Sequence, residues 1–140
     1  MSYLAVIDTN IIISGLLKTP SIPRTILDLV SEGVLIPVIH ASVMEEYEAV
    51  LGRPKFCINP IISQLILNMF QDSGVMIDET VSYNSSLPDE KDRIFYELLL
   101  TVQETDVAYL ITGNLKHFPT SSFIVSPRQM IELIQNEKDY

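Results

Sequence analysis

Short apolar runs recur along the chain and predict the strands of a buried sheet. Runs without polar interruption lie at residues 4–7, 75–77, 109–112 and 123–125. The first of these ends at an acid, which is typical of a strand covered on both faces. A further run at 34–39 contains Pro37, which lacks an N–H and makes a regular central strand there less secure.

Between these runs, apolar residues recur at the three- and four-residue spacing of amphipathic helices. The predicted helices span residues 11–17, 23–31, 42–51, 59–71, 89–104 and 127–136. Pro23 and Pro127 suit first helical positions, where a missing N–H costs little. Alternating strands and helices predict a three-layer α/β/α sandwich with a mainly parallel five-stranded sheet. No linker divides the 140 residues, so we expect one domain over 1–140 with one long loop at 78–88.

In open α/β sheets, ligands bind beyond the carboxyl ends of the strands, so the residues after each run are the first candidates for chemistry. Asp8 and Asn114 both occupy such places. A single Asp there often only closes a turn or caps a helix, because its carboxylate bonds the local backbone. Asp8 becomes a stronger candidate only if other acids meet it.

The helix predicted at 42–51 carries three acids, which helical phase separates. Ser42 and Glu45 have the spacing of a capping box, so Glu45 has a structural role at the helix start. Glu48 lies on the outer flank of the helix. Glu46 falls beside the apolar stripe, about 90° from its centre, and leans toward the sheet. We therefore select Glu46 as the site residue of this helix.

The helix predicted at 89–104 begins with two acids. Asp89 suits the N-cap and Asp92 the third helical position, where acids interact well with the helix dipole. This structural explanation is strong for Asp89, which we keep as an outer-shell candidate. It is weaker for Asp92, because Asp92 borders the apolar stripe and needs a partner there.

Composition limits the kinds of protein that fit. The chain holds 9 Lys and Arg against 18 Asp and Glu, and its net charge of -9 disfavours binding nucleic acid through the general surface. Cys57 is the only cysteine, which excludes an internal disulfide and a cysteine zinc cluster. The start of the chain has no basic region, and Asp8 interrupts its apolar run. We expect a cytoplasmic protein with no membrane segment.

Three inward-leaning acids from separate elements, Asp8, Glu46 and Asp92, would repel one another in a cleft unless a cation joined them. Oxygen donors favour Mg²⁺ or Mn²⁺, and such an ion neutralises charge on a reacting phosphate. His40 and His117 are the only histidines, and no Ser-His-Asp or Cys-His arrangement competes with this interpretation. We expect His117 to be a hydrogen-bonding loop residue rather than a metal ligand.

Four segments of the chain resemble the PIN-domain nucleases, in particular the bacterial and archaeal branch of toxin–antitoxin toxins. These segments are IDTNIIISGLL, EEYEAVLGRPKF, PDEKDRIFYELLL and YLITGNLKHFP, in family order. The resemblance implies the strand order 3-2-1-4-5 and Mg²⁺- or Mn²⁺-dependent endoribonuclease activity on single-stranded RNA. It places the family's three main acids at Asp8, Glu46 and Asp92, in agreement with the choices made from helical phase.

The same resemblance assigns supporting residues. Thr9 and Asn10 match the polar residues after the first acid, and Thr112 matches a hydroxyl residue that orients carboxylates. Asn114 stands where many PIN domains carry a fourth acid. As a metal ligand, Asn114 keeps an acceptor oxygen but lacks the charge, so a second ion would bind weakly or only with substrate.

Basic residues near the predicted cleft are candidates for phosphate binding, although solvated surface charge is the commoner explanation. These residues are Arg53, Lys55 and Lys116. The family also implies an antitoxin partner and a homodimer.

Two other functions stay open. One is a PIN-like interaction module without catalysis. The other is a phosphate-handling protein of the phosphoreceiver or phosphatase type. Asn10 counts against a phosphatase, because such an enzyme would carry a second Asp at that place.

Overall fold

Five parallel strands form the sheet, in the order β3-β2-β1-β4-β5. The computed structural model describes residues 1–138. The strands are β1 (Tyr3–Ile7), β2 (Leu35–Ile39), β3 (Val75–Met76), β4 (Ala108–Ile111) and β5 (Ile124–Val125). The predicted fold class and strand order are confirmed, and each strand boundary differs from the prediction by no more than one residue.

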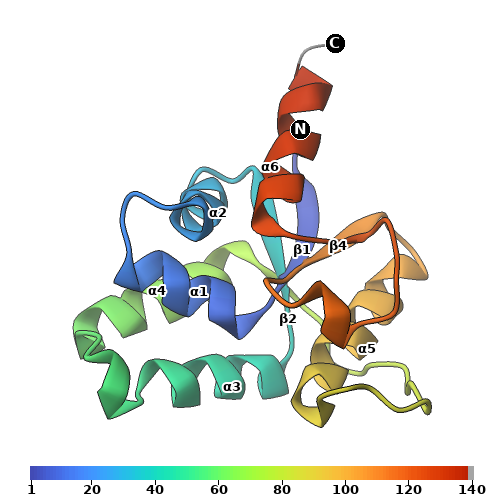
Figure 1. Ribbon diagram of the computed structural model, residues 1–140, viewed down its shortest axis with the longest axis horizontal. Coiled ribbons are helices and arrows are strands. Elements are labelled where there is room, and N and C mark those ends of the chain that lie inside the picture. The colour runs from blue at the N-terminus through green and yellow to red at the C-terminus, as the bar shows by residue number, and fades with distance from the viewer. Residues whose placement is uncertain (139–140) are drawn as a thin grey trace.

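Helices cover both faces of the sheet. They are α1 (Thr9–Leu17), α2 (Ile22–Ser31), α3 (Ala41–Leu51), α4 (Pro60–Ser73), α5 (Arg93–Gln103) and α6 (Pro127–Lys138), with 3-10 turns η1 (Pro54–Phe56), η2 (Glu90–Asp92) and η3 (Leu115–His117). In Figure 1, α5 lies on one side of the strands and α1, α2 and α4 lie on the other. Right-handed crossovers require this, because the chain moves outward from β1 to β3 and then returns across the sheet to β4. Within the described residues, no helix is long and apolar enough to cross a membrane.

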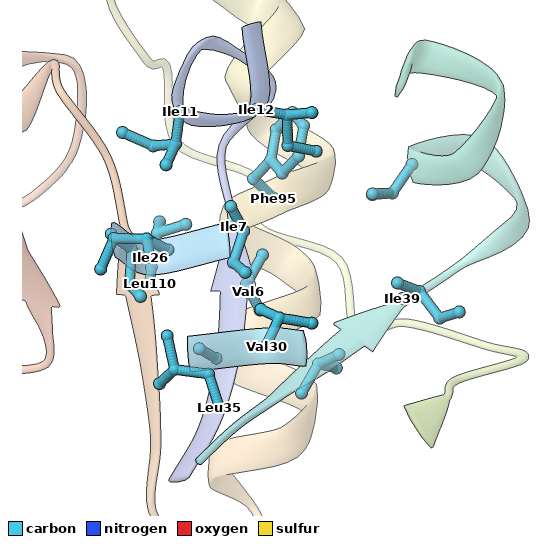
Figure 2. Packing of buried hydrophobic residues seen from close by; sticks show 14 of the residues in the cluster. Val6, Ile7, Ile11, Ile12, Ile26, Val30, Leu35, Ile39, Phe95 and Leu110 are labelled. Atoms are coloured by element: carbon cyan, nitrogen blue, oxygen red, sulfur yellow. The ribbon is translucent and has the colours of Figure 1, made fainter. Parts of the chain in front are cut away.

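The core is built around β1. Val6 and Ile7 have no exposed surface, and Figure 2 shows them in one cluster with Val30 of α2 and Phe95 of α5. Burial of each large aliphatic side chain contributes about 1.5–3 kcal/mol. The residue that follows Ile7 is therefore attached to the fully buried end of the central strand.

Pro37 lies in a regular central strand, contrary to the expected irregularity. β2 pairs with β1 through Pro37 itself, but its pairing with β3 begins only at Val38. Alternate residues of a strand direct their N–H groups to opposite neighbours, and the odd-numbered residues of β2 face β3, as the bond from Ile77 N to Ile39 O shows. Pro37 therefore lacks its N–H where no strand partner is present.

Of the predicted helix starts, only that of α6 is matched, and four others differ by one or two residues. The helix predicted from residue 89 begins at Arg93 as α5, because the 3-10 turn η2 takes the place of its first turn, so Asp92 ends η2 rather than being a third helical residue.

The prediction of a capping box formed by Ser42 and Glu45 is wrong. α3 begins at Ala41, and its N-cap is His40, whose Nδ1 accepts from Ser42 N at 3.0 Å. Pro23 is the second residue of α2 rather than the first. An imidazole can cap a helix as a hydroxyl does, but the serine in the sequence gave the stronger local signal.

Candidate metal centre

Asp8 lies where the strand order reverses. β1 connects through helices to β2 on one side and lies beside β4 on the other, and ligands of open α/β sheets bind at this kind of switch point. Asp8 follows β1 directly, and its backbone N–H donates to the Ile111 carbonyl at 3.0 Å. Thr112, which follows β4, donates its hydroxyl to Asp8 Oδ2 at 2.7 Å. Two neighbouring strands therefore hold this carboxylate in place.

Asp8 is buried, with 4% of its surface exposed. Burial raises the pKa of its carboxyl above the usual range, whereas the Thr112 hydroxyl, the backbone N–H groups of Asn10 and Thr9, and the charge of His117 lower this pKa in part. Within the described residues, Asp8 forms no salt bridge with a lysine or arginine. The carboxylate is thus removed from water without a full cationic partner.

A second set of ligand atoms lies at the start of α5. Asp89, Asp92 and His117 each place a carboxylate oxygen or ring nitrogen within 4.8 Å of the others, and we call them the acid–histidine cluster. Asp92 is buried, whereas Asp89 and His117 are half-buried. Asp92 Oδ2 lies 2.9 Å from His117 Nδ1. Asp89 caps η2 by accepting from Lys91 N at 3.0 Å, as its predicted N-cap role requires.

Electrostatics link this cluster to Asp8. Burial raises the pKa of the Asp92 carboxyl, and the hydrogen bond with His117 lowers it. The negative charges of Asp8 and Asp89 raise it further. The acids of β1 and η2 therefore lie close enough to disfavour each other's charged forms.

Arg93, next in sequence to Asp92, does not neutralise these acids. Its guanidinium instead forms a salt bridge with Glu90 at 2.7 Å and donates to the carbonyl of Ser85 at 3.0 Å and to that of Tyr83. Tyr83 is also held from α5, because its backbone N–H donates to Glu97 at 2.8 Å. Arg93 thus fixes the long 78–88 loop against α5 and leaves the cluster with the imidazole as its basic group.

The sequence model of the PIN domain matches residues 4–116 of this chain, which is more than half of its 140 residues. The chain belongs to the PIN domain family. Proteins of this family have a nuclease-type fold and are generally metal-dependent nucleases. None of the curated proteins compared with this chain matches it.

The PIN fold brings some of the predicted residues together and leaves others apart. The negative charge of Asp8 raises the pKa of Asp92, although among the described residues Asp8 is not part of the acid–histidine cluster. Thr112 bonds Asp8, and Asp89 lies beside Asp92. Glu46 is half-buried on α3, but among the described residues it is not part of the acid–histidine cluster. Asn114 is half-buried, and its backbone N–H donates to Thr112 Oγ1 at 3.0 Å. The assignments of Glu46 and Asn114 as ligands stay predictions.

The three basic residues predicted to bind phosphate lie in two places in this PIN domain. Arg53 lines a cleft of about 270 Å³ between the end of α3 and the start of α4, together with Glu48 and Cys57. Lys55 lies over the ring of Phe56, with its Nζ 5.1 Å from the ring centroid. The exposed Lys116, by contrast, belongs to η3 and is the neighbour of His117 in the cluster. Of the three proposed phosphate contacts, only Lys116 is adjacent in sequence to a residue of the cluster.

The sequence predicts that His117 is a hydrogen-bonding loop residue, and His117 does bond Asp92. Its membership of the cluster was missed, because phase arguments apply to helices and His117 lies in a turn after β4. The available signal was its place beyond the carboxyl end of β4, the same rule that selected Asp8.

The donor set of this PIN domain fits a divalent cation. The carboxyls of Asp8 and Asp92 have raised pKa values, and the charge of Asp8 contributes to the rise at Asp92. Within the described residues, neither has a lysine or arginine partner. Thr9, next to Asp8 and 4% exposed, has a buried Oγ1 that lacks a hydrogen-bond partner in the described structure. Buried polar atoms are rarely left in that state. Its position beside Asp8 is compatible with an added ligand or ordered water.

The raised pKa of Asp8 predicts how metal-free stability depends on pH. A carboxyl whose folded-state pKa exceeds its ordinary value of 3.8 stabilises the fold below that value and loses this contribution as the pH rises through the folded-state pKa. Asp8→Asn should therefore be more stable than the wild type near pH 7.5 in EDTA, and the difference should shrink toward pH 4. Urea unfolding across this range tests it. The exposed loop variant Asp78→Asn is the control, and a gap independent of pH would contradict the prediction.

Tyr47 helps to hold the backbone just before Asp8 in place. Its buried hydroxyl donates to the carbonyl of Ile7, which lies beyond the last pair of β1 with β2. Burial, and then the negative charge of Asp8, raise the pKa of the Tyr47 phenol well above its ordinary value. We expect Tyr47→Phe to lower the free energy of unfolding by about 1–2 kcal/mol, because a buried carbonyl loses its donor.

The matched control for Tyr47→Phe is Tyr109→Phe. Tyr109 is half-buried, and its hydroxyl has no hydrogen-bond partner within the described residues, so this change should stay within about 0.5 kcal/mol. Equal urea midpoints for the two variants would contradict a supporting role for Tyr47.

Proposed function

We propose that this PIN domain is a metal-dependent endoribonuclease that hydrolyses phosphodiester bonds of single-stranded RNA. The observation that carries the proposal is the pair of buried acids Asp8 and Asp92, which come from separate elements and raise each other's cost of ionisation at the switch point of the sheet. Buried acids that repel each other are typical of a functional site, because a bound cation offsets their charge and can then bind a charged substrate.

Asp8, Asp92 and Asp89 would hold the ion, which is Mg²⁺ or Mn²⁺ in this proposal, with Glu46 and Asn114 as the further predicted ligands. A divalent ion bound there supplies Lewis-acid stabilisation of the charge that develops on the phosphate. The chain's own part is orientation, because the Thr112 hydroxyl holds Asp8 Oδ2 and the guanidinium of Arg93 holds the loop before Asp89.

Several features support a single strand as substrate. The net charge of -9 gives no broad basic surface for a duplex, whose binding requires many phosphate contacts. The exposed Lys116 beside the cluster suits one or two phosphates. The four PIN-like segments support RNA as the substrate, since the branch they resemble consists of endoribonucleases.

The proposal is tested with end-labelled oligonucleotides of one sequence, prepared as single-stranded RNA, duplex RNA and single-stranded DNA. We expect cleavage of the single-stranded RNA with Mn²⁺ or Mg²⁺, none in EDTA, and restoration when excess metal is added. The absence of metal-dependent cleavage of any substrate would favour a non-catalytic interaction module. Equal cleavage of DNA would contradict the RNA preference.

The toxin role is a further part of the proposal and is supported by the resemblance of the four segments. It implies a protein inhibitor, the antitoxin, and a homodimeric toxin. Expression of the isolated chain should arrest growth of its host, whereas the Asp8→Asn variant should not. Purification of the native protein from its own cells as a lone monomer would count against both partners.

A further inference from the structure

We propose that His117 is a direct ligand of the ion, and that its nitrogen makes this PIN centre prefer a transition-metal ion such as Mn²⁺ over Mg²⁺. The inference rests on the proposed function, because it takes for granted that a divalent ion binds beside Asp8 and Asp92. It goes beyond that function in naming a nitrogen ligand and the kind of ion that this ligand selects.

The spacing of the acid–histidine cluster fits one ion. Two ligand atoms on opposite sides of an ion lie about 4.2 Å apart when each metal–ligand distance is about 2.1 Å. The ligand atoms of Asp89, Asp92 and His117 all lie within 4.8 Å of one another. Movements of a few tenths of an ångström in half-buried side chains would bring all three into one coordination shell.

The alternative role for His117 is to orient Asp92 without touching the ion, as outer-shell histidines and carboxylates do. An imidazole with only that role would need one ring nitrogen, and Nδ1 already provides it at 2.9 Å from Asp92 Oδ2. The other nitrogen, Nε2, has no hydrogen-bond partner within the described residues, and 38% of the His117 side chain is exposed. The ring therefore has a second nitrogen that is not used within the described residues and that could bind an ion.

A buried polar atom next to Asp8 in the sequence also lacks a partner. Thr9 Oγ1 lacks a hydrogen-bond partner in the described structure although Thr9 is 4% exposed, and it follows Asp8 directly. Asp8 lies close enough to Asp92 to affect its ionisation. The residue that follows Asp8 therefore carries a buried oxygen whose hydrogen-bonding capacity is unused within the described structure.

A nitrogen ligand changes the ion preference of a carboxylate site. Mg²⁺ is a hard ion that binds oxygen and keeps several of its waters, so replacing one oxygen by an imidazole costs it affinity. First-row transition ions accept imidazole readily, and their affinities rise along the series that begins with Mn²⁺. His117 should therefore favour Mn²⁺, and its loss should weaken Mn²⁺ binding more than Mg²⁺ binding.

The decisive measurement is pulsed electron paramagnetic resonance of Mn²⁺ bound to the full chain, which detects a directly coordinated ¹⁴N nucleus. The chain offers a matched control, because His40 is the only other histidine and its ring caps α3 through Ser42. We expect ¹⁴N coupling in the wild type and in His40→Gln, and none in His117→Gln. Absence of the coupling in wild type that has bound Mn²⁺ would overturn the inference.

Calorimetric titration with Mn²⁺ and Mg²⁺ gives a second readout. His117→Gln should weaken Mn²⁺ binding about 10-fold, while Mg²⁺ binding changes less than about 3-fold. An equal change for both ions would overturn the inference and leave the nuclease proposal intact. Failure of the wild type to bind either ion or to cleave RNA would instead refute the proposed function itself, so the two failures are distinguishable.

Discussion

Replacing Asp8 or Asp92 by Asn is expected to reduce metal-dependent RNA cleavage by about 100-fold or more, while each variant stays folded. Asn keeps the size of the side chain and one acceptor oxygen, so the Asp8 variant can still accept the Thr112 hydroxyl. It loses the negative charge that holds a cation. Because Asp8 and Asp92 disfavour each other's ionisation, removing either charge should relax the metal-free fold rather than strain it.

Cleavage rates with Mn²⁺ are compared with circular dichroism and urea midpoints of the same preparations. Asp72→Asn on the exposed end of α4 is the control for changing an aspartate, and it should cleave like the wild type. Unaltered cleavage in both Asp8→Asn and Asp92→Asn would refute the nuclease assignment. A loss of activity together with unfolding would contradict the reasoning on repulsion.

The corresponding Glu46→Gln variant decides whether the acid chosen from helical phase belongs to the site. Glu46 is half-buried on α3 and lies outside the acid–histidine cluster. A loss comparable to that of Asp8→Asn would assign Glu46 as a ligand recruited when an ion binds. Wild-type cleavage would remove Glu46 from the predicted ligands.

Gly74→Ala is expected to lower the free energy of unfolding by about 2–3 kcal/mol. Gly74 ends α4 and leads into β3, where the chain passes close to β2. A Cβ at this position would lie 2.4 Å from the carbonyl oxygen of Phe70 and 2.8 Å from that of Pro37. Both are backbone atoms, so the clash can be relieved only by moving the end of α4 or β2.

Urea unfolding measures this effect, and Gly52→Ala is the matched control. Gly52 ends α3 in a helical conformation, and a Cβ there would lie at an ordinary 3.4 Å from the carbonyl oxygen of Glu48. The control should change stability by less than about 1 kcal/mol, with a small gain because alanine restricts the unfolded chain. Similar midpoints for the two variants would show that the approach of α4 to Pro37 is not rigid.

Local patterns in the chain predicted the strands, the helices and the layered α/β architecture, whereas the strand order came from the resemblance to the PIN domains. Each strand is a short apolar run, and the period of apolar residues gave the helices to within a few positions, because burial of one face or of both faces leaves a periodic trace in sequence. The strand-end rule and helical phase also selected Asp8 and Asp92, which the fold brings together. The predictions failed where two neighbouring residues could each take the same local role. At the start of α3, His40 caps the helix instead of Ser42.

The sequence by itself therefore determined the order of the elements and selected Asp8 and Asp92, the two acids that are buried, since both depend on spacing along one element. Only the tertiary structure decided that His117 joins Asp89 and Asp92, that Arg93 is used by the 78–88 loop, and that Pro37 is tolerated in a central strand. These outcomes depend on distances between atoms far apart in the chain. Such distances are set by how helices pack on a twisted sheet, and no periodicity in sequence records them.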